Sequence, residues 1–323
     1  MSSDCARPFW PKVRALVTGG NGFVGRHLCA ELRARGAGVV VAGRTIDGAH
    51  VDLPLDLGDL DNVRGVVEVA RADVIFHLAA QAFVPAATSD PLPTYDTNVT
   101  GTARLIEAIR GLPAAVRPRL LYVSSGEVYG AHDVADLPLR ETAQTRPATP
   151  YAASKLAAEA IVGASARTYG LWAVVTRAFN HIGPGQSESF VVAAFARRLA
   201  TIAAGGDPLF PVGNLTAERD FLDVRDVVRA YADLAERGVP GEIYNVCSGV
   251  PTKIQDVLRE LVMAARVGVE IREDPALLRP VDVPVYYGDP AKLIATTGWE
   301  REYALARSLR DVYVSVRGAT TGP

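Results

Sequence analysis

The chain has 323 residues, of which 49% are hydrophobic and 22% charged, and its formal net charge is -2. This balance is typical of a folded protein with a substantial core, and it excludes the strongly basic surface of a nucleic-acid or membrane-surface binder. Its three cysteines, Cys5, Cys29 and Cys247, have neither disulfide-framework nor metal-ligand spacing. The sequence has no apolar signal core and no bilayer-length apolar run, so we expect a soluble cytoplasmic protein without a metal.

Strands and helices alternate through the first half of the chain. Short apolar runs predict buried strands at residues 13–18, 39–42, 73–78, 120–124 and 171–176. Amphipathic stretches predict helices from residue 24 and over residues 63–70, 98–109 and 151–169. Regular alternation of this kind predicts an α/β fold, a Rossmann-type doubly wound parallel sheet.

The regular alternation of strand and helix ends after residue 177. A loop is predicted at residues 180–186, a strand returning to the first sheet at 243–246, and helices at 190–204, 224–236, 253–265 and 304–316. We therefore expect a smaller C-terminal α/β lobe interleaved with the first domain. The dinucleotide-binding domain would take residues 12–178 and about 224–247, and the substrate lobe residues 179–223 and 248–323.

A glycine-rich turn follows the first predicted strand. Gly19, Gly22 and Gly25 are spaced three apart, and an amphipathic helix begins immediately after them. The first glycine permits a tight turn, the second a close approach of the backbone to a pyrophosphate, and the third close helix–strand packing. The free N–H groups of the helix would bind the phosphates, so the turn predicts a dinucleotide site.

The end of the second strand indicates which dinucleotide binds. An acid there holds the ribose 2′-hydroxyl of NAD, whereas an arginine accommodates the 2′-phosphate of NADP. This chain has Gly43 and Arg44 at that place, so NADP(H) is preferred over NAD(H). Asp56 and Leu57 are candidates to meet the adenine.

Tyr151 and Lys155 are four residues apart on a predicted helix and therefore share one face. A lysine ammonium near a phenol favours the phenolate, so we expect Lys155 to lower the pKa of Tyr151 toward neutrality. A tyrosine tuned in this way can exchange a proton with a carbonyl or hydroxyl group.

Several motifs in order resemble those of the extended short-chain dehydrogenase/reductases that modify nucleotide sugars. They are the glycine-rich turn, residues 76–80 (Phe-His-Leu-Ala-Ala), residues 124–130 (Ser-Ser-Gly-Glu-Val-Tyr-Gly), the Tyr151–Lys155 motif and residues 219–221 (Arg-Asp-Phe). Within that family, residues 177–186 and 125–127 look most like GDP-4-keto-6-deoxy-D-mannose reductases. The resemblance covers about residues 13–299 and implies a homodimer formed through the helices at 98–109 and 151–169.

The resemblance also implies roles for individual residues. The catalytic candidates are Ser125, Tyr151, Lys155 and Glu127. The cofactor-binding candidates are Gly19, Asn21, Gly22, Phe23, Val24, Gly25, Arg44, Asp56, Leu57, Leu78, Ala79, Ala80, Tyr151 and Lys155. The substrate-binding candidates are Gln81, Ser125, Gly126, Glu127, Asn180, Arg219 and Arg279, of which the two arginines would hold the nucleotide diphosphate.

The activity implied is NADPH-dependent reduction at C4 of a GDP-4-keto-6-deoxy sugar, either the mannose-derived hexose, giving GDP-D-rhamnose, or a 6-deoxy-heptose analogue. The alternatives are a 4,6-dehydratase or a 4-epimerase, and a non-catalytic NADP(H)-binding sensor. Glu127 matches the residue that removes the C5 proton in dehydratases, but Gly126 has no side chain to protonate a leaving hydroxyl. This combination favours the reductase.

Overall fold

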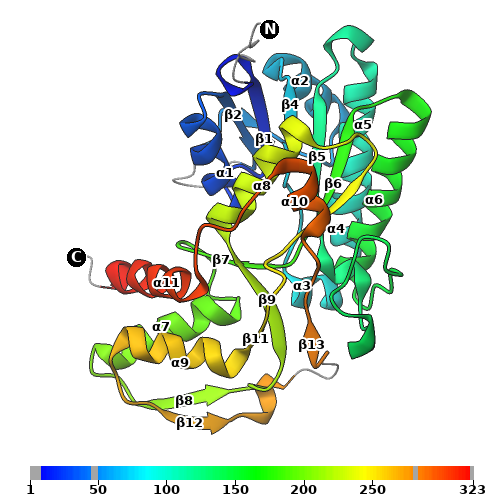
Figure 1. Ribbon diagram of the computed structural model, residues 1–323. Helices are drawn as coiled ribbons and strands as arrows, with labels where there is room; N and C mark the ends of the chain where they lie inside the picture. The colour runs from blue at the N-terminus through cyan, green and yellow to red at the C-terminus, as the bar shows by residue number, and fades with distance from the viewer. Residues whose placement is uncertain (1–8, 45–49, 279–282, 321–323) are drawn as a thin grey trace, which may run out of the picture.

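A seven-stranded parallel sheet forms the centre of the larger lobe in the computed structural model, which describes residues 9–44, 50–278 and 283–320 (Figure 1). The strand order is β10-β6-β5-β4-β1-β2-β3. The strands are β1 (Arg14–Thr18), β2 (Gly38–Gly43), β3 (Leu53–Pro54), β4 (Val74–His77), β5 (Arg119–Ser125), β6 (Ala173–Ala178) and β10 (Ile243–Val246). The order reverses beside β1, which confirms the predicted doubly wound sheet and its returning strand at 243–246.

Helices cover both faces of this sheet (Figure 1). One face carries α1 (Phe23–Ala34), α8 (Val224–Arg237) and α10 (Ala291–Thr297), and the other carries α2 (Leu60–Ala70), α5 (Gly101–Gly111) and α6 (Pro150–Tyr169). Successive side chains of β1 point to opposite faces of the sheet. Ala15 and Val17 pack with α1, whereas Leu16 packs with α2 and α5. The sheet therefore lies between two apolar cores, one on each face, and these fix its strands and with them the carboxyl edge of the sheet.

The predicted helix at residues 98–109 is present, and its first residues form a π-helical rather than an α-helical turn. Two short helices, α3 (Val84–Ser89) and α4 (Leu92–Tyr95), lead into a π-helical turn, Asp96–Thr100, before α5 begins. The buried side chain of Asn98 lies in this turn and bonds to both backbone groups of Gln81. A wider turn of this kind is common at functional sites, and here it aims Asn98 at the loop after β4.

The smaller lobe combines short strands with three packed helices (Figure 1). Its strands are β7 (Asn180–Ile182), β8 (Leu209–Val212), β9 (Glu218–Asp223), β11 (Pro251–Lys253), β12 (Glu270–Glu273) and β13 (Val285–Tyr286). Its helices are α7 (Val191–Ala203), α9 (Ile254–Ala265) and α11 (Leu305–Thr320). β7 corrects the predicted loop at 180–186, because its residues pair in parallel with β9.

A buried carboxylate joins the segments that cross between the two lobes. Asp220 is fully buried on β9 and accepts N–H groups from Ser248 at 2.7 Å, Gly249 at 3.0 Å and Gly288 at 3.4 Å. These donors follow β10 and β13, so one side chain fixes the chain where it leaves the large sheet and where it returns. Burial raises the pKa of Asp220 against the effect of these bonds.

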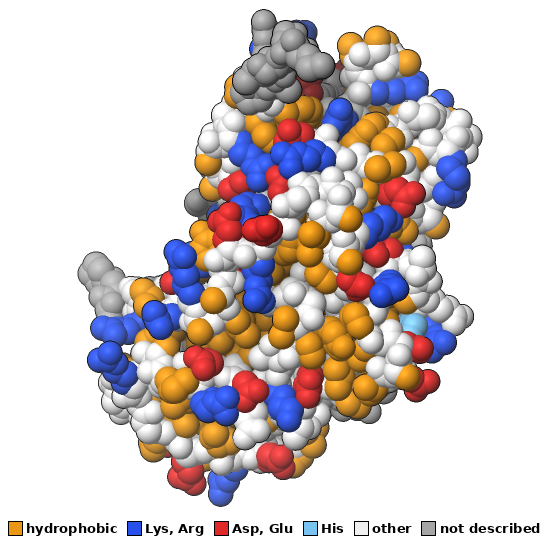
Figure 2. Space-filling model, viewed as in Figure 1, with side chains coloured by type: hydrophobic (Ala, Val, Ile, Leu, Met, Phe, Trp, Pro, Cys, Tyr) orange, Lys and Arg blue, Asp and Glu red, His pale blue; other side chains and the backbone are white. Residues whose placement is uncertain are grey.

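Acidic and basic side chains are interspersed on the face drawn in Figure 2, as the near-neutral net charge predicts. None of the helices within the described ranges has the length and apolar character needed to cross a membrane.

Candidate active site

The glycine-rich turn has the geometry that its spacing predicts. Gly19 has φ +70°, and the Gly22 N–H donates to the Gly19 carbonyl at 3.0 Å. A Cβ on Gly25 would lie 2.2 Å from the Gly19 oxygen, so a side chain at this position would break the turn. Gly22 precedes α1 and has no side chain to cap it, which leaves the first N–H groups of the helix available to an anion.

The turn rests on the loop that follows β4. A Cβ on Gly19 would lie 2.9 Å from the Ala79 nitrogen and 3.1 Å from the Leu78 carbonyl carbon. Leu78 and Ala79 therefore lie beside the turn at the carboxyl edge, and Ala80 follows them in the loop. Gln81 is at this edge too, but its side-chain amide is bonded to the backbone of Phe83 at 2.6 and 3.1 Å.

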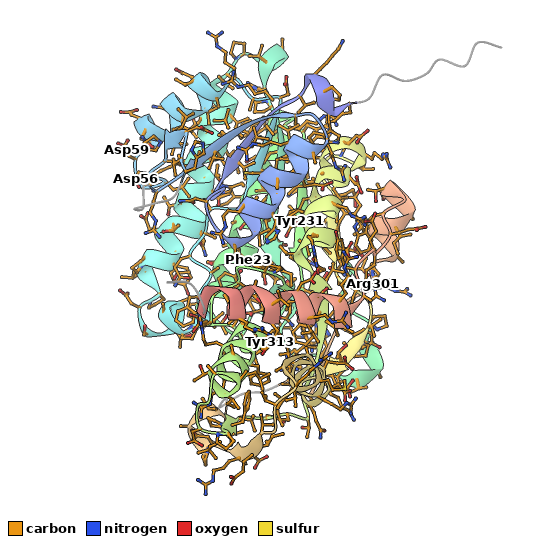
Figure 3. The ribbon with its side chains drawn as sticks, turned by 90° about the vertical axis from the view of Figure 1, so that its left-hand side faces the viewer. Phe23, Asp56, Asp59, Tyr231, Arg301 and Tyr313 are labelled. Atoms are coloured by element: carbon orange, nitrogen blue, oxygen red, sulfur yellow. The ribbon has the colours of Figure 1, made fainter. Side chains whose placement is uncertain are left out.

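The predicted adenine and ribose contacts lie at the far side of the turn. Arg44 is exposed just beyond β2, and the Asn21 amide donates to its carbonyl oxygen at 3.0 Å. Asp56 is exposed, and its carboxylate accepts the Gly58 N–H at 2.8 Å, whereas the side chain of Leu57 is buried. Figure 3 shows Asp56 beside Asp59 near the start of α2, and Phe23 at the start of α1.

Phe23 and Val24 begin α1 and are partly buried. The ring of Phe23 stacks on the ring of His181, with centroids 6.1 Å apart and planes 15° from parallel. His181 also contacts the Phe179 carbonyl through Nδ1 at 3.1 Å, and burial lowers its pKa. His181 thus joins the glycine-rich helix to β7 of the smaller lobe.

A chain of hydrogen bonds through His77 connects the carboxyl edge of the sheet with α5. In the sequence, His77 was notable only as part of the Phe-His-Leu-Ala-Ala motif. The Ala79 N–H donates to the Thr18 hydroxyl, which lies 2.7 Å from His77 Nδ1. His77 Nε2 lies 3.1 Å from the Thr102 hydroxyl, which donates to the Asn98 carbonyl at 2.6 Å. Since Thr102 gives its proton to Asn98, it accepts from Nε2–H, and His77 is the neutral Nε2–H tautomer.

Burial, with a smaller effect of Lys155, lowers the pKa of His77 from 6.5 to about 3. Between these values the unfolded chain binds a proton that the folded protein does not, so the free energy of unfolding falls as the pH is lowered through that window. We expect His77 ring nitrogen shifts to show a neutral Nε2–H tautomer from about pH 7 to about pH 4, and a His77→Asn variant to lose this part of the pH dependence. Titration of the His77 ring near 6.5 would contradict the assignment.

Ser125 lies at the end of β5, and Tyr151 and Lys155 lie in the first turns of the adjoining helix α6. Ser125 is the last residue of β5, and its hydroxyl accepts the Glu127 N–H at 3.2 Å. Tyr151 lies in the first turn of α6, where the Thr149 hydroxyl caps the helix by accepting the Ala152 N–H at 3.1 Å. Lys155 is buried and donates from Nζ to the Val123 carbonyl at 2.8 Å.

The predicted lowering of the Tyr151 pKa is wrong. Burial raises the pKa of Tyr151, the Glu127 carboxylate raises it further, and a hydrogen bond with Ser125 lowers it by less. The Lys155 ammonium is directed at the Val123 carbonyl, and burial lowers its own pKa to about 8. Tyr151 is therefore a protonated phenol at neutral pH, which suits a group that gives up a proton.

Gly126 is enclosed by aromatic rings that sequence reasoning did not find. A Cβ at this position would lie 3.1 Å from the ring of Phe179, and the Tyr286 hydroxyl donates to the Gly126 carbonyl. The ring centroids of Phe179 and Tyr286 are 5.3 Å apart. Tyr286 comes from β13, so the smaller lobe contacts the turn that holds Ser125 and Glu127. No local sequence pattern indicates a contact between residues 160 positions apart.

Asn180 and Arg219, two further substrate candidates, lie on the smaller lobe. Asn180 is exposed on β7, and Arg219 on β9 donates from Nη1 to the carbonyls of Glu218 at 2.8 Å and Val283 at 2.6 Å. Arg219 is therefore bonded to the backbone that leads into β13. Arg279 lies outside the described residues.

A buried ion pair fixes α6 against β6. Arg177 and Glu159 approach to 2.7 Å with side chains only 5% and 4% exposed, and the Ser124 hydroxyl donates to Glu159 Oε1 at 2.5 Å. Arg177 also lies over the ring of Tyr129, 4.7 Å from its centroid. Since Glu159 is one helical turn beyond Lys155, this pair sets the position of the helix that holds Tyr151 and Lys155.

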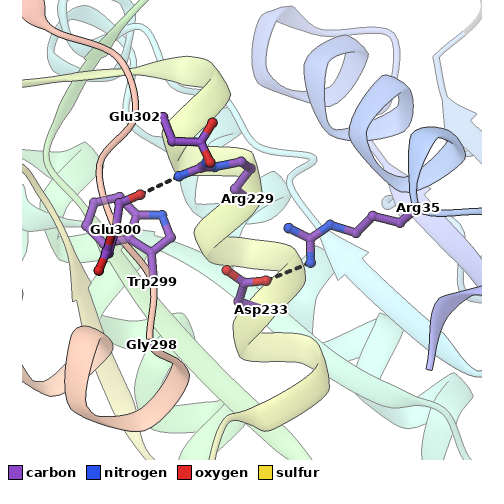
Figure 4. Close-up of a pocket in the computed structure, with 7 residues that line it drawn as sticks. All are labelled: Arg35, Arg229, Asp233, Gly298, Trp299, Glu300 and Glu302. Atoms are coloured by element: carbon purple, nitrogen blue, oxygen red, sulfur yellow. Dashed lines mark hydrogen bonds and ion pairs between the residues drawn. The ribbon is translucent and has the colours of Figure 1, made fainter. Parts of the chain in front are cut away.

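A surface recess away from the predicted site lies between α1, α8 and the segment that precedes α11 (Figure 4). Both arginines that line it are paired, because Arg35 bonds to Asp233 at 2.6 Å and Arg229 contacts Glu302 and the Glu300 carbonyl. These pairs fasten the C-terminal segment to α8. No residue of the predicted site lines this recess.

The doubly wound sheet, the glycine-rich turn and the Ser125–Tyr151–Lys155 cluster define an extended short-chain dehydrogenase/reductase. A family model described as GDP-mannose 4,6 dehydratase matches residues 16–312. The chain belongs to this family, and it is an NAD(P)-dependent oxidoreductase of the class that acts on nucleotide sugars.

Three relatives illustrate the similarity. A GDP-6-deoxy-D-mannose reductase from Pseudomonas aeruginosa is 40% identical over 307 residues, covering 93% of this chain and 95% of the relative. The structure of RMD from Pseudomonas aeruginosa complexed with NADPH aligns with TM-score 0.84 and 39% identity, covering 95% and 99% of the two chains. UDP-glucose 4-epimerase from Thermus thermophilus, complexed with NAD, aligns with TM-score 0.84, 32% identity and the same coverage.

Proposed function

We propose that the chain is an NADPH-dependent ketoreductase that reduces C4 of a GDP-4-keto-6-deoxy sugar. The observation that carries the proposal is the pairing of the Ser125 hydroxyl with a protonated Tyr151 beside Gly126. The hydroxyls of Ser125 and Tyr151 can polarise a ketone. Gly126 has no side chain and cannot supply the acid that water elimination requires. The name of the Pseudomonas aeruginosa reductase supports the same activity.

The residues present fit a dinucleotide. Gly19, Gly22 and Gly25 leave a cradle without side chains at the start of α1, and β2 ends in Gly43 followed by Arg44 rather than in an acid. We propose NADP(H) as the cofactor, with exposed Arg44 binding the 2′-phosphate. NADPH, when bound, supplies the hydride that the chemistry needs. Asn21, Phe23, Val24, Asp56, Leu57 and residues 78–80 are proposed to line this site with Tyr151 and Lys155.

The side chains of the protein orient the sugar and donate one proton to it. Ser125 and Tyr151 donate hydrogen bonds to the C4 ketone oxygen, and Tyr151 gives this oxygen its proton as negative charge develops. The raised pKa of Tyr151 keeps that proton on the phenol until the oxygen becomes basic. Lys155, held by the Val123 carbonyl, is proposed to bind the nicotinamide ribose.

The substrate contacts belong to the same proposal. Gln81, Gly126, Glu127 and Asn180 would surround the sugar, and Arg219 and Arg279 would bind the diphosphate. The Glu127 carboxylate is close enough to raise the pKa of both Tyr151 and Tyr286, so it faces the same space as the phenols. An acceptor at this point suits the hydroxyl groups of a sugar.

We also propose a cytoplasmic homodimer formed through α5 and α6. The outer side of α6 exposes Ala157, Ala160 and Ala164, whose small side chains permit close approach of a second helix. Cys29 and Cys247 are free and buried, which suits a reducing compartment.

The test is NADPH consumption with GDP-4-keto-6-deoxy-mannose made in place from GDP-mannose by a separate dehydratase, with NMR identification of the product. We expect oxidation of one NADPH per sugar and formation of GDP-D-rhamnose. A heptose analogue run in parallel distinguishes the two sugar sizes. A 4-keto product from GDP-mannose alone would instead favour the dehydratase that the family description names.

A further inference from the structure

The backbone at the end of β2 is fixed from both sides. The Ala42 carbonyl accepts the Gly19 N–H at 2.7 Å, and the Gly43 carbonyl accepts the Leu55 N–H at 2.9 Å. Gly43 also pairs with Pro54 of β3. The backbone of Gly43 is therefore fixed between the glycine-rich turn and β3, and it cannot shift to relieve a clash with a neighbouring side chain.

The side chain of Asn21 lies above this position and is itself held. Its Nδ2 donates to the Arg44 carbonyl at 3.0 Å, and its own backbone carbonyl accepts Arg26 Nη1 at 3.1 Å. Rotating the amide away from Gly43 would break the bond to Arg44. The cost of that rotation is the loss of a hydrogen bond at the edge of the sheet.

Gly43 has no room for a side chain in this arrangement. A Cβ there would lie 2.8 Å from Asn21 Oδ1, 3.3 Å from its Cγ and 3.5 Å from its Nδ2, so the whole amide covers the site. A carboxylate at position 43 would in addition face the amide oxygen, and two acceptors repel each other. Asn21 and an acidic residue 43 therefore exclude each other.

We propose that Asn21 is a specificity-determining residue, because its amide fills the place that an acid at position 43 would need in order to bind a ribose 2′-hydroxyl. With that place filled, the exposed Arg44 directly follows it in the chain, and a positive charge there favours a 2′-phosphate. The inference rests on the proposed use of NADP(H). It adds that cofactor preference resides in the pair formed by residues 21 and 43.

The steric part is tested without cofactor, by thermal unfolding of Gly43→Ala, Asn21→Ala and the double variant. Overpacking destabilises, so we expect Gly43→Ala to lower Tm by several degrees and Asn21→Ala to restore most of that loss. Gly38→Ala, at the other end of β2, is the matched control, because its Cβ would meet only the Val13 oxygen at 3.9 Å. Additive effects of the two substitutions on Tm would overturn the proposal.

The specificity part is tested by measuring Kd for NADPH and for NADH through nucleotide fluorescence. We expect Gly43→Asp alone to weaken NADPH binding without improving NADH binding. Adding Asn21→Ala to it should tighten NADH binding at least about tenfold relative to Gly43→Asp. An equal gain in NADH affinity from Gly43→Asp alone would overturn the proposal. A wild-type protein that binds both nucleotides equally contradicts the proposed cofactor instead, and the Tm coupling remains a separate test.

Discussion

A Tyr151→Phe variant is expected to lose turnover by roughly 10²- to 10⁴-fold, the usual contribution of a general acid, while its Kd for NADPH stays close to wild type. The phenol hydroxyl is the group that bonds with Ser125 and holds a proton at neutral pH because burial and Glu127 raise its pKa. Phenylalanine keeps the ring and removes only this hydroxyl. The measurement is kcat with the keto sugar, together with NADPH affinity by fluorescence.

Tyr169→Phe is the matched control for this experiment. Tyr169 is the last residue of the same helix, α6, and is 48% exposed, so removal of its hydroxyl should leave kcat unchanged. Wild-type turnover by Tyr151→Phe would remove Tyr151 from the mechanism. A loss shared equally by the Tyr169 variant would point to the helix as a whole.

The largest effect on stability is expected at Arg177. Its replacement by methionine leaves the buried Glu159 carboxylate with the Ser124 hydroxyl as its remaining donor among the described residues, and it removes the contact with the Tyr129 ring. Breaking one partner of a buried ion pair costs about 3–5 kcal/mol. We therefore expect the free energy of unfolding in urea to fall by that amount, with reduced activity because α6 loses its anchor.

The exposed pair formed by Glu107 and Arg110 provides the control. These side chains are 40% and 42% exposed and lie 2.7 Å apart, so Arg110→Met should lower the free energy of unfolding far less than Arg177→Met does. Replacing Arg177 and Glu159 together by apolar residues should be less damaging than Arg177→Met alone, because no buried charge is left uncompensated. Equal losses for Arg177→Met and Arg110→Met would contradict this account of the helix anchor.

The sequence predicted those parts of the site that depend on local spacing. The Gly19–Gly25 turn and the Tyr151–Lys155 pair each lie within a few residues, so a periodic pattern is sufficient to identify them. The parallel, doubly wound character of the large sheet follows from the alternation of strand and helix. These features were predictable because short-range geometry determines them.

Features that depend on distant segments were not predictable. Tyr286 reaches Gly126 from β13, and the π-helical turn at Asn98 depends on the position of the Gln81 backbone. The pKa of Tyr151 was wrongly predicted for the same reason. Spacing on the helix indicates that Lys155 shares its face, but it does not indicate that Nζ binds the Val123 carbonyl or that Glu127 approaches the phenol.

The proposed reduction of C4 of a keto sugar at the expense of added NADPH can be tested directly. The most direct measurement uses NADPH deuterated at the transferable C4 position, GDP-4-keto-6-deoxy-mannose and NMR of the sugar product. We expect a product with deuterium at C4 of the sugar and at no other sugar carbon. Consumption of GDP-mannose without added NADPH, or a product without deuterium at C4, would contradict it.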